Sequence, residues 1–222
     1  MQLLDDIRAS VIDGQYERCE ELTRQALDQN VSPSEILNGG LIPAMDEVGV
    51  RFQNNEFFLP EVLIAAKAMN SAMNILKPLL SQTGVKARGR IVIGTVQGDR
   101  HDIGKNLVAM MMEGAGFEVI DLGVDVSPDR FVKAVEEHRP DIVAMSALLT
   151  TTMPAMKETI QSLEKAGLRK SVKTMIGGAP VSLSFAEEIG ADAHAPDSAS
   201  AVAKMKEIFI AQDSRSQGSS TS

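Results

Sequence analysis

The stretch Arg90-Ile-Val-Ile-Gly-Thr-Val-Gln-Gly-Asp-Arg-His-Asp-Ile-Gly-Lys105 decides how the second half of the chain is interpreted. It begins with a β-branched, apolar run that is typical of a buried strand. It continues into a polar loop with two glycines, which is typical of a turn between elements. Because a helix-length segment follows this loop, the stretch predicts the start of an α/β domain.

Three similar apolar runs follow this strand, and helix-length segments separate them. They are 118–122, 141–145 and 173–177, and 191–194 is a further candidate for a strand at the edge of the sheet. Short apolar strands that alternate with helices form a parallel sheet with helices on both faces. We therefore expect a Rossmann-like, flavodoxin-like domain over residues 87–212, with its last helix over 198–210. The segment 213–222 is rich in Ser, Gln and charge, and we expect it to be disordered.

The first 80 residues show helical periodicity instead. Their apolar residues recur mostly at spacings of three and four, as on one face of a helix. Ser32-Pro-Ser-Glu35 combines an N-cap, a proline at the first helical position and the glutamate of a capping box. Pro60 opens the last of four expected helices. The pattern predicts a four-helix bundle over residues 1–86, which the glycine-containing segment 81–89 links to the α/β domain.

Composition and charge exclude several classes of protein. The chain has 222 residues, of which 44% are hydrophobic and 23% charged, as in soluble globular proteins. No apolar run approaches the ~18 residues that cross a bilayer, so we expect no membrane protein. The N-terminus has no signal-peptide pattern, which favours a cytoplasmic location. A net charge of −8 argues against nucleic-acid binding, and the single Cys19 excludes a multi-thiolate metal site within the chain.

The loop after the first strand does not match the common phosphate-binding motifs. A Walker loop has four residues between its glycines, but Gly98 and Gly104 have five between them, and no Gly-x-Gly-x-x-Gly occurs. The loop does contain Asp99-x-His101, and metal-binding histidines commonly donate their second ring N–H to a carboxylate. Gly104 would let a bulky ligand approach the backbone. The ordinary alternative is that His101 starts a helix and Asp99 is its N-cap.

Small and hydroxylated residues follow two other strands. The third strand runs into Ser146-Ala-Leu-Leu-Thr-Thr-Thr152, and the fourth runs into Gly177-Gly-Ala-Pro180. Ligands of open parallel sheets bind at the carboxyl ends of the strands. We therefore expect a deep slot at this edge, filled by something long and flat.

These motifs together resemble a known family. Asp99-x-His101-x-x-Gly104, Ser146-x-Leu148 and Gly177-Gly178 occur in this order, after a helical half that contains Phe58-Leu-Pro-Glu61. The sequence resembles the corrinoid proteins of anaerobic methyltransferase systems, and less closely the cobalamin-binding module of methionine synthase. The resemblance covers roughly residues 1–210.

The resemblance implies a role for each site residue. His101 would be the lower axial ligand of the cobalt of a cobalamin in place of the cofactor's own benzimidazole, and Asp99 and Thr152 would complete a relay behind it. The displaced tail would enter the slot, and in the helical half Phe52, Phe58, Leu59 and Val62 would cap the cobalt-bound methyl group. The other residues implied to bind the cofactor are Gly98, Arg100, Asp102, Ile103, Gly104, Ser146, Leu148, Thr150, Gly177, Gly178, Ala179 and Ser198.

The resemblance also implies a function. The protein would be a carrier that cycles between methylcobalamin and cob(I)alamin. A substrate-specific methyltransferase would load it, and a second methyltransferase would pass the methyl group to tetrahydrofolate or a thiol. A reductive activase is a further implied partner, and a homodimer is left open. We identify no catalytic base in the chain, so it would be a non-catalytic subunit of the methyltransferase system.

Three other classes of protein are alternatives to the carrier. A cobalamin-dependent sensor also joins a helical bundle to such a domain, but such sensors usually carry a tryptophan-containing cap, and this chain has no Trp. An adenosylcobalamin mutase subunit would need a barrel that 222 residues cannot supply. In a flavodoxin-like interaction module, His101 would be structural and no corrinoid would bind. The methyl donor, the methyl acceptor and the kind of corrinoid are left open by the residues.

Overall fold

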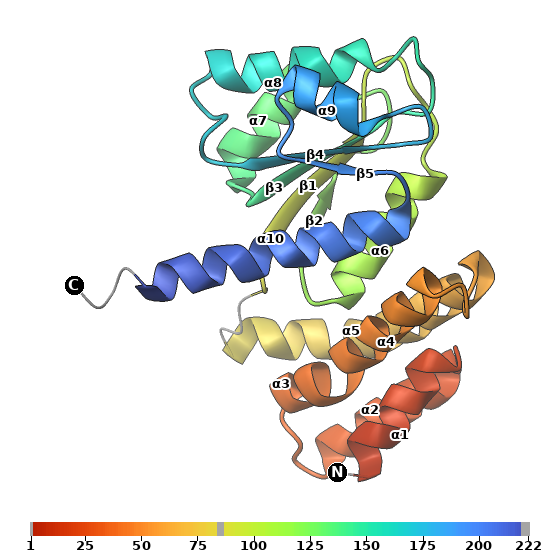
Figure 1. Cartoon of the computed structure of the whole chain (residues 1–222). Helices are drawn as coiled ribbons and strands as arrows, with labels where there is room; N and C mark the ends of the chain where they lie inside the picture. The colour runs from red at the N-terminus through yellow and green to blue at the C-terminus, as the bar shows by residue number, and fades with distance from the viewer. Residues whose placement is uncertain (1, 84–86, 219–222) are drawn as a thin grey trace. The chain divides into compact units, whose positions relative to one another are not determined.

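The structure is a computed structural model that describes residues 2–83 and 87–218 (Figure 1). Two compact units are present: residues 1–88 together with 110–117, and residues 89–109 together with 118–222. The division along the chain falls close to the predicted boundary between residues 86 and 87, and the domain limits themselves stay a prediction. In the described residues, no helix is both long enough and apolar enough to cross a membrane.

The helical unit contains the four expected helices, one of which is interrupted. Ser32 caps it as predicted, because its hydroxyl oxygen accepts from the Glu35 N–H at 3.2 Å and the Glu35 carboxylate accepts from the Ser32 N–H at 3.0 Å. A π-helical turn, η1, then joins α3 to α4 without a break in the helical backbone. The elements are α1 (Gln2–Ile12), α2 (Tyr16–Asp28), α3 (Pro33–Ile36), η1 (Leu37–Leu41), α4 (Ile42–Gln53) and α5 (Leu59–Thr83).

The π-helical turn coincides with a close approach of α1. A Cβ atom on Gly39 would lie 3.0 Å from the Leu4 side chain, and a Cβ atom on Gly40 would lie 3.2 Å from the Ile7 side chain. Ile7 is fully buried, so the two glycines let the chain pack directly against the core of this unit. Residues 37–41 were expected to continue an ordinary α-helix, and the Gly39-Gly40 pair accounts for the local difference.

The second unit is built on a five-stranded parallel sheet in the order β2-β1-β3-β4-β5, which confirms the predicted fold class. The order is that of flavodoxin-like sheets. The fifth strand lies at the edge, as expected. The strands are β1 (Arg90–Thr95), β2 (Glu118–Asp121), β3 (Ile142–Ser146), β4 (Lys173–Gly177) and β5 (Ala193–Ala195).

Helices cover both faces of this sheet. On one face, α7 (Pro128–His138), α8 (Pro154–Lys165) and α9 (Leu183–Ile189) pack a continuous apolar core against the strands (Figure 1). On the other face lie α10 (Ser198–Gly218) and the beginning of α6 (Ile103–Gly114). Helix α10 extends to Gly218, beyond its expected end at residue 210. Residues 219–222 of the expected tail lie outside the described residues.

Asp192 fixes the edge of the sheet. One carboxylate oxygen accepts from Lys173 Nζ at 2.9 Å, and the other accepts from the Thr174 N–H at 2.9 Å and lies 2.7 Å from Arg169 Nη2. These contacts tie the turn before β5 to the first residues of β4. Burial alone would raise the pKa of Asp192, but the bonds from Lys173 and Thr174 and the Arg169 charge outweigh it and lower the pKa below its usual value.

Candidate functional site

The site lies where the chain reverses its direction of winding. From β1 the chain goes to β2 on one side and later returns to β3 on the other side of β1. The loops that follow β1 and β3 therefore separate at their carboxyl ends and leave a crevice, which is the usual ligand site in open parallel sheets. Asp99 and His101 lie in the first loop, and Thr152 lies in the second.

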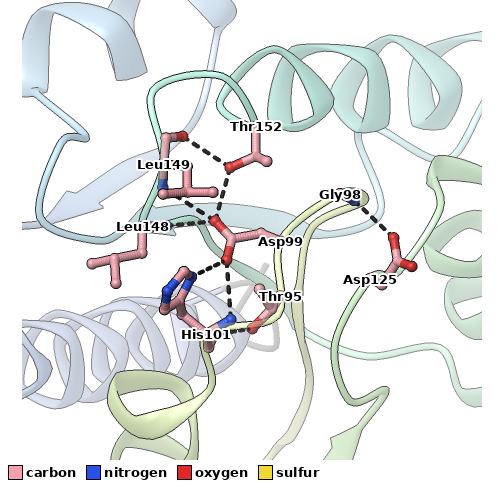
Figure 2. Close-up of polar contacts among 8 residues, drawn as sticks. All are labelled: Thr95, Gly98, Asp99, His101, Asp125, Leu148, Leu149 and Thr152. Carbon is pink, nitrogen blue, oxygen red and sulfur yellow. Dashed lines mark hydrogen bonds and ion pairs between the residues drawn. The ribbon is translucent and has the colours of Figure 1, made fainter.

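Asp99 joins the two loops (Figure 2). Its side chain is fully buried, and its Oδ2 accepts hydrogen bonds from the Leu148 N–H at 2.8 Å, the Leu149 N–H at 3.2 Å and the Thr152 hydroxyl at 2.8 Å. Its Oδ1 faces His101 and accepts from the backbone N–H at 3.0 Å. The carboxylate therefore has only donors around it.

The surroundings of Asp99 keep it ionised. Burial without partners would raise its pKa, because a charge is costly to remove from water. The backbone N–H groups of His101 and Leu148, the His101 ring and the Thr152 hydroxyl outweigh this effect and hold the pKa well below its usual value. Asp99 is thus a permanent acceptor at neutral pH.

The charge of Asp99 sets the tautomer of His101. The ring Nδ1 lies 2.7 Å from Asp99 Oδ1, and a carboxylate oxygen can only accept, so Nδ1 carries the proton. In the neutral ring, Nε2 then has a free lone pair. The side chain of His101 is 52% exposed, and the Thr95 hydroxyl donates to its carbonyl oxygen at 2.9 Å. The helix-start alternative does not hold, because α6 begins at Ile103 and Asp99 lies four residues before it.

A pocket of about 540 Å³ adjoins His101, and all the residues that line it belong to the α/β unit. Two rows of residues on one face of the sheet form its wall. The row at the strand ends contains Ser146, Gly177 and Ala195, which are in register with one another. Since side chains alternate along a strand, the same face continues two residues earlier in a second row. That row consists of Ile93, Ala144 and Met175.

Two helices close the opposite side of this pocket. Helix α6 contributes Gly104, Lys105 and Val108, and α10 contributes Ser198, Ala201 and Met205. Lys105 is 3% exposed, and its ammonium group pairs with Asp121. The lysine therefore brings no free charge to the pocket.

The glycines of the site have different roles. A Cβ atom on Gly104 would meet nothing within 4 Å, so this glycine leaves open space on the pocket wall, as expected for close approach of a ligand. Gly178 has φ +128°, and a Cβ atom there would lie 1.9 Å from the Ala147 carbonyl oxygen. A Cβ atom on Gly177 would lie 2.8 Å from the Ala195 carbonyl oxygen. The Gly177-Gly178 pair is thus required by the protein's own backbone, whatever room it also gives a ligand.

Most residues expected to bind a cofactor do come together in this pocket. Thr150 does not: it is exposed in the loop after β3 and lies outside the lining. Gly98 and Asp99 also lie outside it, Asp99 because it is buried behind His101. The expected residues that line the pocket are Arg100, His101, Asp102, Ile103, Gly104, Ser146, Leu148, Gly177, Gly178, Ala179 and Ser198.

Sequence reasoning missed the deeper part of the lining. These residues lie before the strand ends or inside helices, where an apolar residue has the same pattern whether it lines a pocket or fills a core. The signal that could have found the sheet residues is strand alternation, counted two residues back from Ser146 and Gly177. The missed residues include Ile93, Lys105, Val108, Ala144, Met175, Ala201 and Met205.

The four residues expected to cap a methyl group belong to the helical unit and differ in exposure. Phe58 is 62% exposed, whereas Val62 is fully buried. Phe52 and Leu59 are half-buried. Their role as a cap stays a prediction.

Comparison with known proteins connects these features. Residues 89–204 match a family model described as "B12 binding domain", and residues 3–77 match a second model with the same description. The trimethylamine corrinoid protein of Methanosarcina barkeri is 42% identical over 207 residues, which cover 92% of this chain and 95% of that protein. The chain belongs to the corrinoid methyl-carrier family. The resemblance found from the sequence motifs is thereby confirmed, and its cofactor is a corrinoid.

Other relatives of this corrinoid protein agree over almost the whole chain. The dimethylamine corrinoid protein 1 of Methanosarcina acetivorans is 42% identical over 209 residues, which cover 94% of this chain and 98% of that one. A crystal structure of a cobalamin-binding protein from Desulfitobacterium hafniense is 33% identical, with a TM-score of 0.75 over 92% of this chain and 98% of that one. A chain of the methanol:cobalamin methyltransferase complex of M. barkeri is 28% identical, with a TM-score of 0.87 over 94% of this chain and 80% of that one.

The residues of this corrinoid protein fit its cofactor. The ring of a corrinoid already holds its cobalt, so the protein would have to provide at most one nitrogen donor. His101 offers one ring nitrogen with a free lone pair, and the pocket adjoins it. The open space at Gly104 gives a large ring room to approach the loop.

Proposed function

We propose that this corrinoid protein binds cobalamin with its benzimidazole tail detached and with His101 as the lower ligand of cobalt. The observation that carries the proposal is the bond between His101 Nδ1 and the buried Asp99, which leaves Nε2 of the neutral ring unprotonated on a half-exposed side chain that lines a pocket. The detached tail would occupy that pocket. When bound, the corrinoid supplies the methyl chemistry, because its cobalt can accept a methyl group and give it to an acceptor.

The protein's part in this chemistry is to hold and release a proton on His101. With Nε2 bound to cobalt, the ring would be neutral, and Asp99 would fix its orientation through Nδ1. When Nε2 is free it can take up a proton, and the Asp99 carboxylate stabilises the imidazolium that results. The Thr152 hydroxyl and the Leu148 N–H hold the carboxylate in place. Release of the His101 ring from cobalt would therefore be coupled to proton uptake at Nε2.

The partners proposed for this chain follow from what its relatives are called. A structural relative forms part of a methanol:cobalamin methyltransferase complex, and curated relatives are named for trimethylamine and dimethylamine. We propose that a substrate-specific methyltransferase loads this carrier, with methylated amines as the first donors to test. A second methyltransferase would unload it to tetrahydrofolate or a thiol, and a reductive activase would restore it after oxidation. The cytoplasmic location expected from the sequence is part of this proposal.

The assignment of His101 is tested by electron paramagnetic resonance of the Co(II) form in protein labelled with ¹⁵N-histidine. We expect hyperfine splitting from the label and its loss in His101→Gln. His138→Gln is the matched control, because His138 lies at the end of α7 and should not matter. If the splitting arises from the cofactor's own nitrogen in the wild type, the assignment is wrong. His194 lies in the middle of β5, and its Nε2 lies 2.8 Å from the Val181 carbonyl oxygen.

The cap over the methyl group is a separate part of the proposal. Phe58 is a large apolar side chain that is 62% exposed, although most such side chains are buried. We expect Phe58→Ala to leave corrinoid content unchanged and to speed the photolysis of the methylated form, since an open site lets the methyl radical escape. Val50→Ala is the control, because Val50 is also an exposed apolar residue of the helical unit, at 54%. Equal photolysis in both variants would remove Phe58 from the cap.

A further inference from the structure

The pocket beside His101 differs sharply between its mouth and its floor. At the mouth, near the strand ends, lie the polar or charged residues Arg100, Asp102, Ser146, Asp197 and Ser198. The row that lies two residues deeper on the sheet contains no polar side chain. The pocket wall therefore changes from polar to apolar over two residues along the strands.

The floor is formed by apolar side chains from three directions. Ile93 and Met175 come from the sheet, Val108 from α6, and Met205 from α10. They are 3%, 2%, 7% and 1% exposed, respectively. Met205 lies seven residues, or about two helical turns, beyond Ser198 at the start of α10, so the helix also leads from a polar mouth to an apolar end.

The floor has no free hydrogen-bonding group to offer a ligand. The strands that carry Ile93, Ala144 and Met175 pair with a neighbour on each side, which occupies their backbone groups. The backbone groups at Val108 and Met205 lie inside helices. In the part of the chain that the structure describes, no buried side-chain nitrogen or oxygen lacks a partner. A polar atom of a ligand that reached the floor would lose its bonds to water and gain none.

The bases found at the ends of corrinoid tails differ in how many polar atoms they carry. A dimethylbenzimidazole presents a carbocyclic edge with two methyl groups, so the edge that would reach the floor has no atom that forms a hydrogen bond. An adenine presents ring nitrogens and an exocyclic amine along the corresponding edge. Burial of these atoms without partners would weaken binding. Methionine side chains adapt to a flat apolar group, which suits the benzimidazole.

We infer that the floor formed by Ile93, Val108, Met175 and Met205 selects corrinoids by their lower base, and that it accepts an apolar benzimidazole and rejects a purine. This inference rests on the proposed function, since it requires the tail to be detached and inserted. It assigns the choice of corrinoid to the α/β unit alone.

The test compares three corrinoids with the full-length apoprotein by calorimetric titration: cobalamin, the adenine-containing pseudocobalamin, and cobinamide, which lacks the nucleotide tail. We expect cobalamin to bind at least about tenfold more tightly than pseudocobalamin, which corresponds to ~1.4 kcal/mol. Equal or tighter binding of pseudocobalamin overturns the inference and leaves the proposed function standing. If cobinamide binds as tightly as cobalamin, the tail is not held and the inference also fails. If none of the three binds, the proposed function itself is wrong.

A pair of variants locates the selection in the floor. Met205→Gln places an amide there, and we expect it to narrow the ratio between cobalamin and pseudocobalamin severalfold. Met205→Leu keeps the floor apolar and should leave the ratio unchanged. An unchanged ratio in a folded Met205→Gln protein overturns the assignment to this residue. The wild-type comparison needs no substitution, so the inference stays testable even if a variant does not fold.

Discussion

Replacement of Asp99 by Asn should change both the stability of the α/β unit and the tautomer of His101. The five contacts of the Asp99 carboxylate all come from donors: the backbone N–H groups of His101, Leu148 and Leu149, the Thr152 hydroxyl and the His101 ring. An amide has one oxygen to accept and one NH₂ group that can only donate. In Asp99→Asn, the NH₂ group must therefore take the place of one carboxylate oxygen and point at hydrogen-bond donors, with which it cannot pair.

The hydrogen bond that the substitution removes is expected to be the one between the His101 backbone N–H and Oδ1. If the amide oxygen takes the position of Oδ2, it keeps the bonds from Leu148, Leu149 and Thr152, and the NH₂ group faces the His101 N–H. The bond from that N–H to a charged acceptor is lost, which costs about 1.5 to 3 kcal/mol. For a protein of 222 residues we expect Tm to fall by about 3 to 12 °C. The ring Nδ1 then accepts from the amide, so the ring proton moves to Nε2.

Two-bond ¹H–¹⁵N spectra of histidine-labelled apoprotein distinguish the tautomers. We expect Nδ1–H in the wild type and Nε2–H in Asp99→Asn, with weaker corrinoid binding because Nε2 is no longer a free base. Asp125→Asn is the matched control, since Asp125 accepts one bond, from the Gly98 N–H at 2.7 Å, and an amide oxygen can accept it equally well. Retention of the Nδ1–H tautomer with an unchanged Tm in Asp99→Asn would refute this account of the relay.

Three further predictions follow from other residues. Gly104→Ala should keep or slightly raise Tm and weaken corrinoid binding, because its Cβ meets no protein atom within 4 Å, whereas Gly49→Ala in α4 should leave binding unchanged in the same titration. Asp192→Asn should lower the unfolding free energy at neutral pH; since the folded-state pKa of Asp192 lies below its unfolded value, the difference from wild type should shrink as pH falls below ~4 in urea titrations, and a constant difference would contradict this. Burial raises the pKa of the Cys19 thiol despite bonds with Ser10 and Thr23, so a thiol reagent should modify it much more slowly in native than in urea-unfolded protein, and equal rates would show that the site is open.

Strand positions could be predicted from the sequence because each strand is a short apolar run with polar ends. β4 has the predicted bounds, β2 ends one residue early, and β3 and β5 differ from the prediction by one or two residues at both ends. The local sequence pattern could not predict the π-helical turn at Gly39-Gly40, because the turn depends on contacts with Leu4 and Ile7, which are distant in sequence. Local pattern specifies an element, and packing between elements specifies its distortions.

The relay residues could be predicted, but the connections of Asp99 could not. The pair Asp99 and His101 is visible in the sequence because a carboxylate and an imidazole lie two positions apart in one loop. The bonds from Leu148 and Leu149 are made by backbone N–H groups, which every residue other than proline has, so no side chain marks them. The floor of the pocket was missed for a related reason, since Met175 and Met205 have the pattern of ordinary core residues.

The single oxygen Oδ1 of Asp99 accepts from both the ring and the backbone N–H of His101, and Oδ2 of the same carboxylate holds the loop after β3. The ring, the main chain of its own loop and the backbone of Leu148 are therefore joined through one rigid planar group. A displacement of the imidazole that keeps these bonds must move Leu148 as well, and Leu148 and Leu149 are 44% and 42% exposed. The position of the ring is in this way tied to the backbone of an exposed loop.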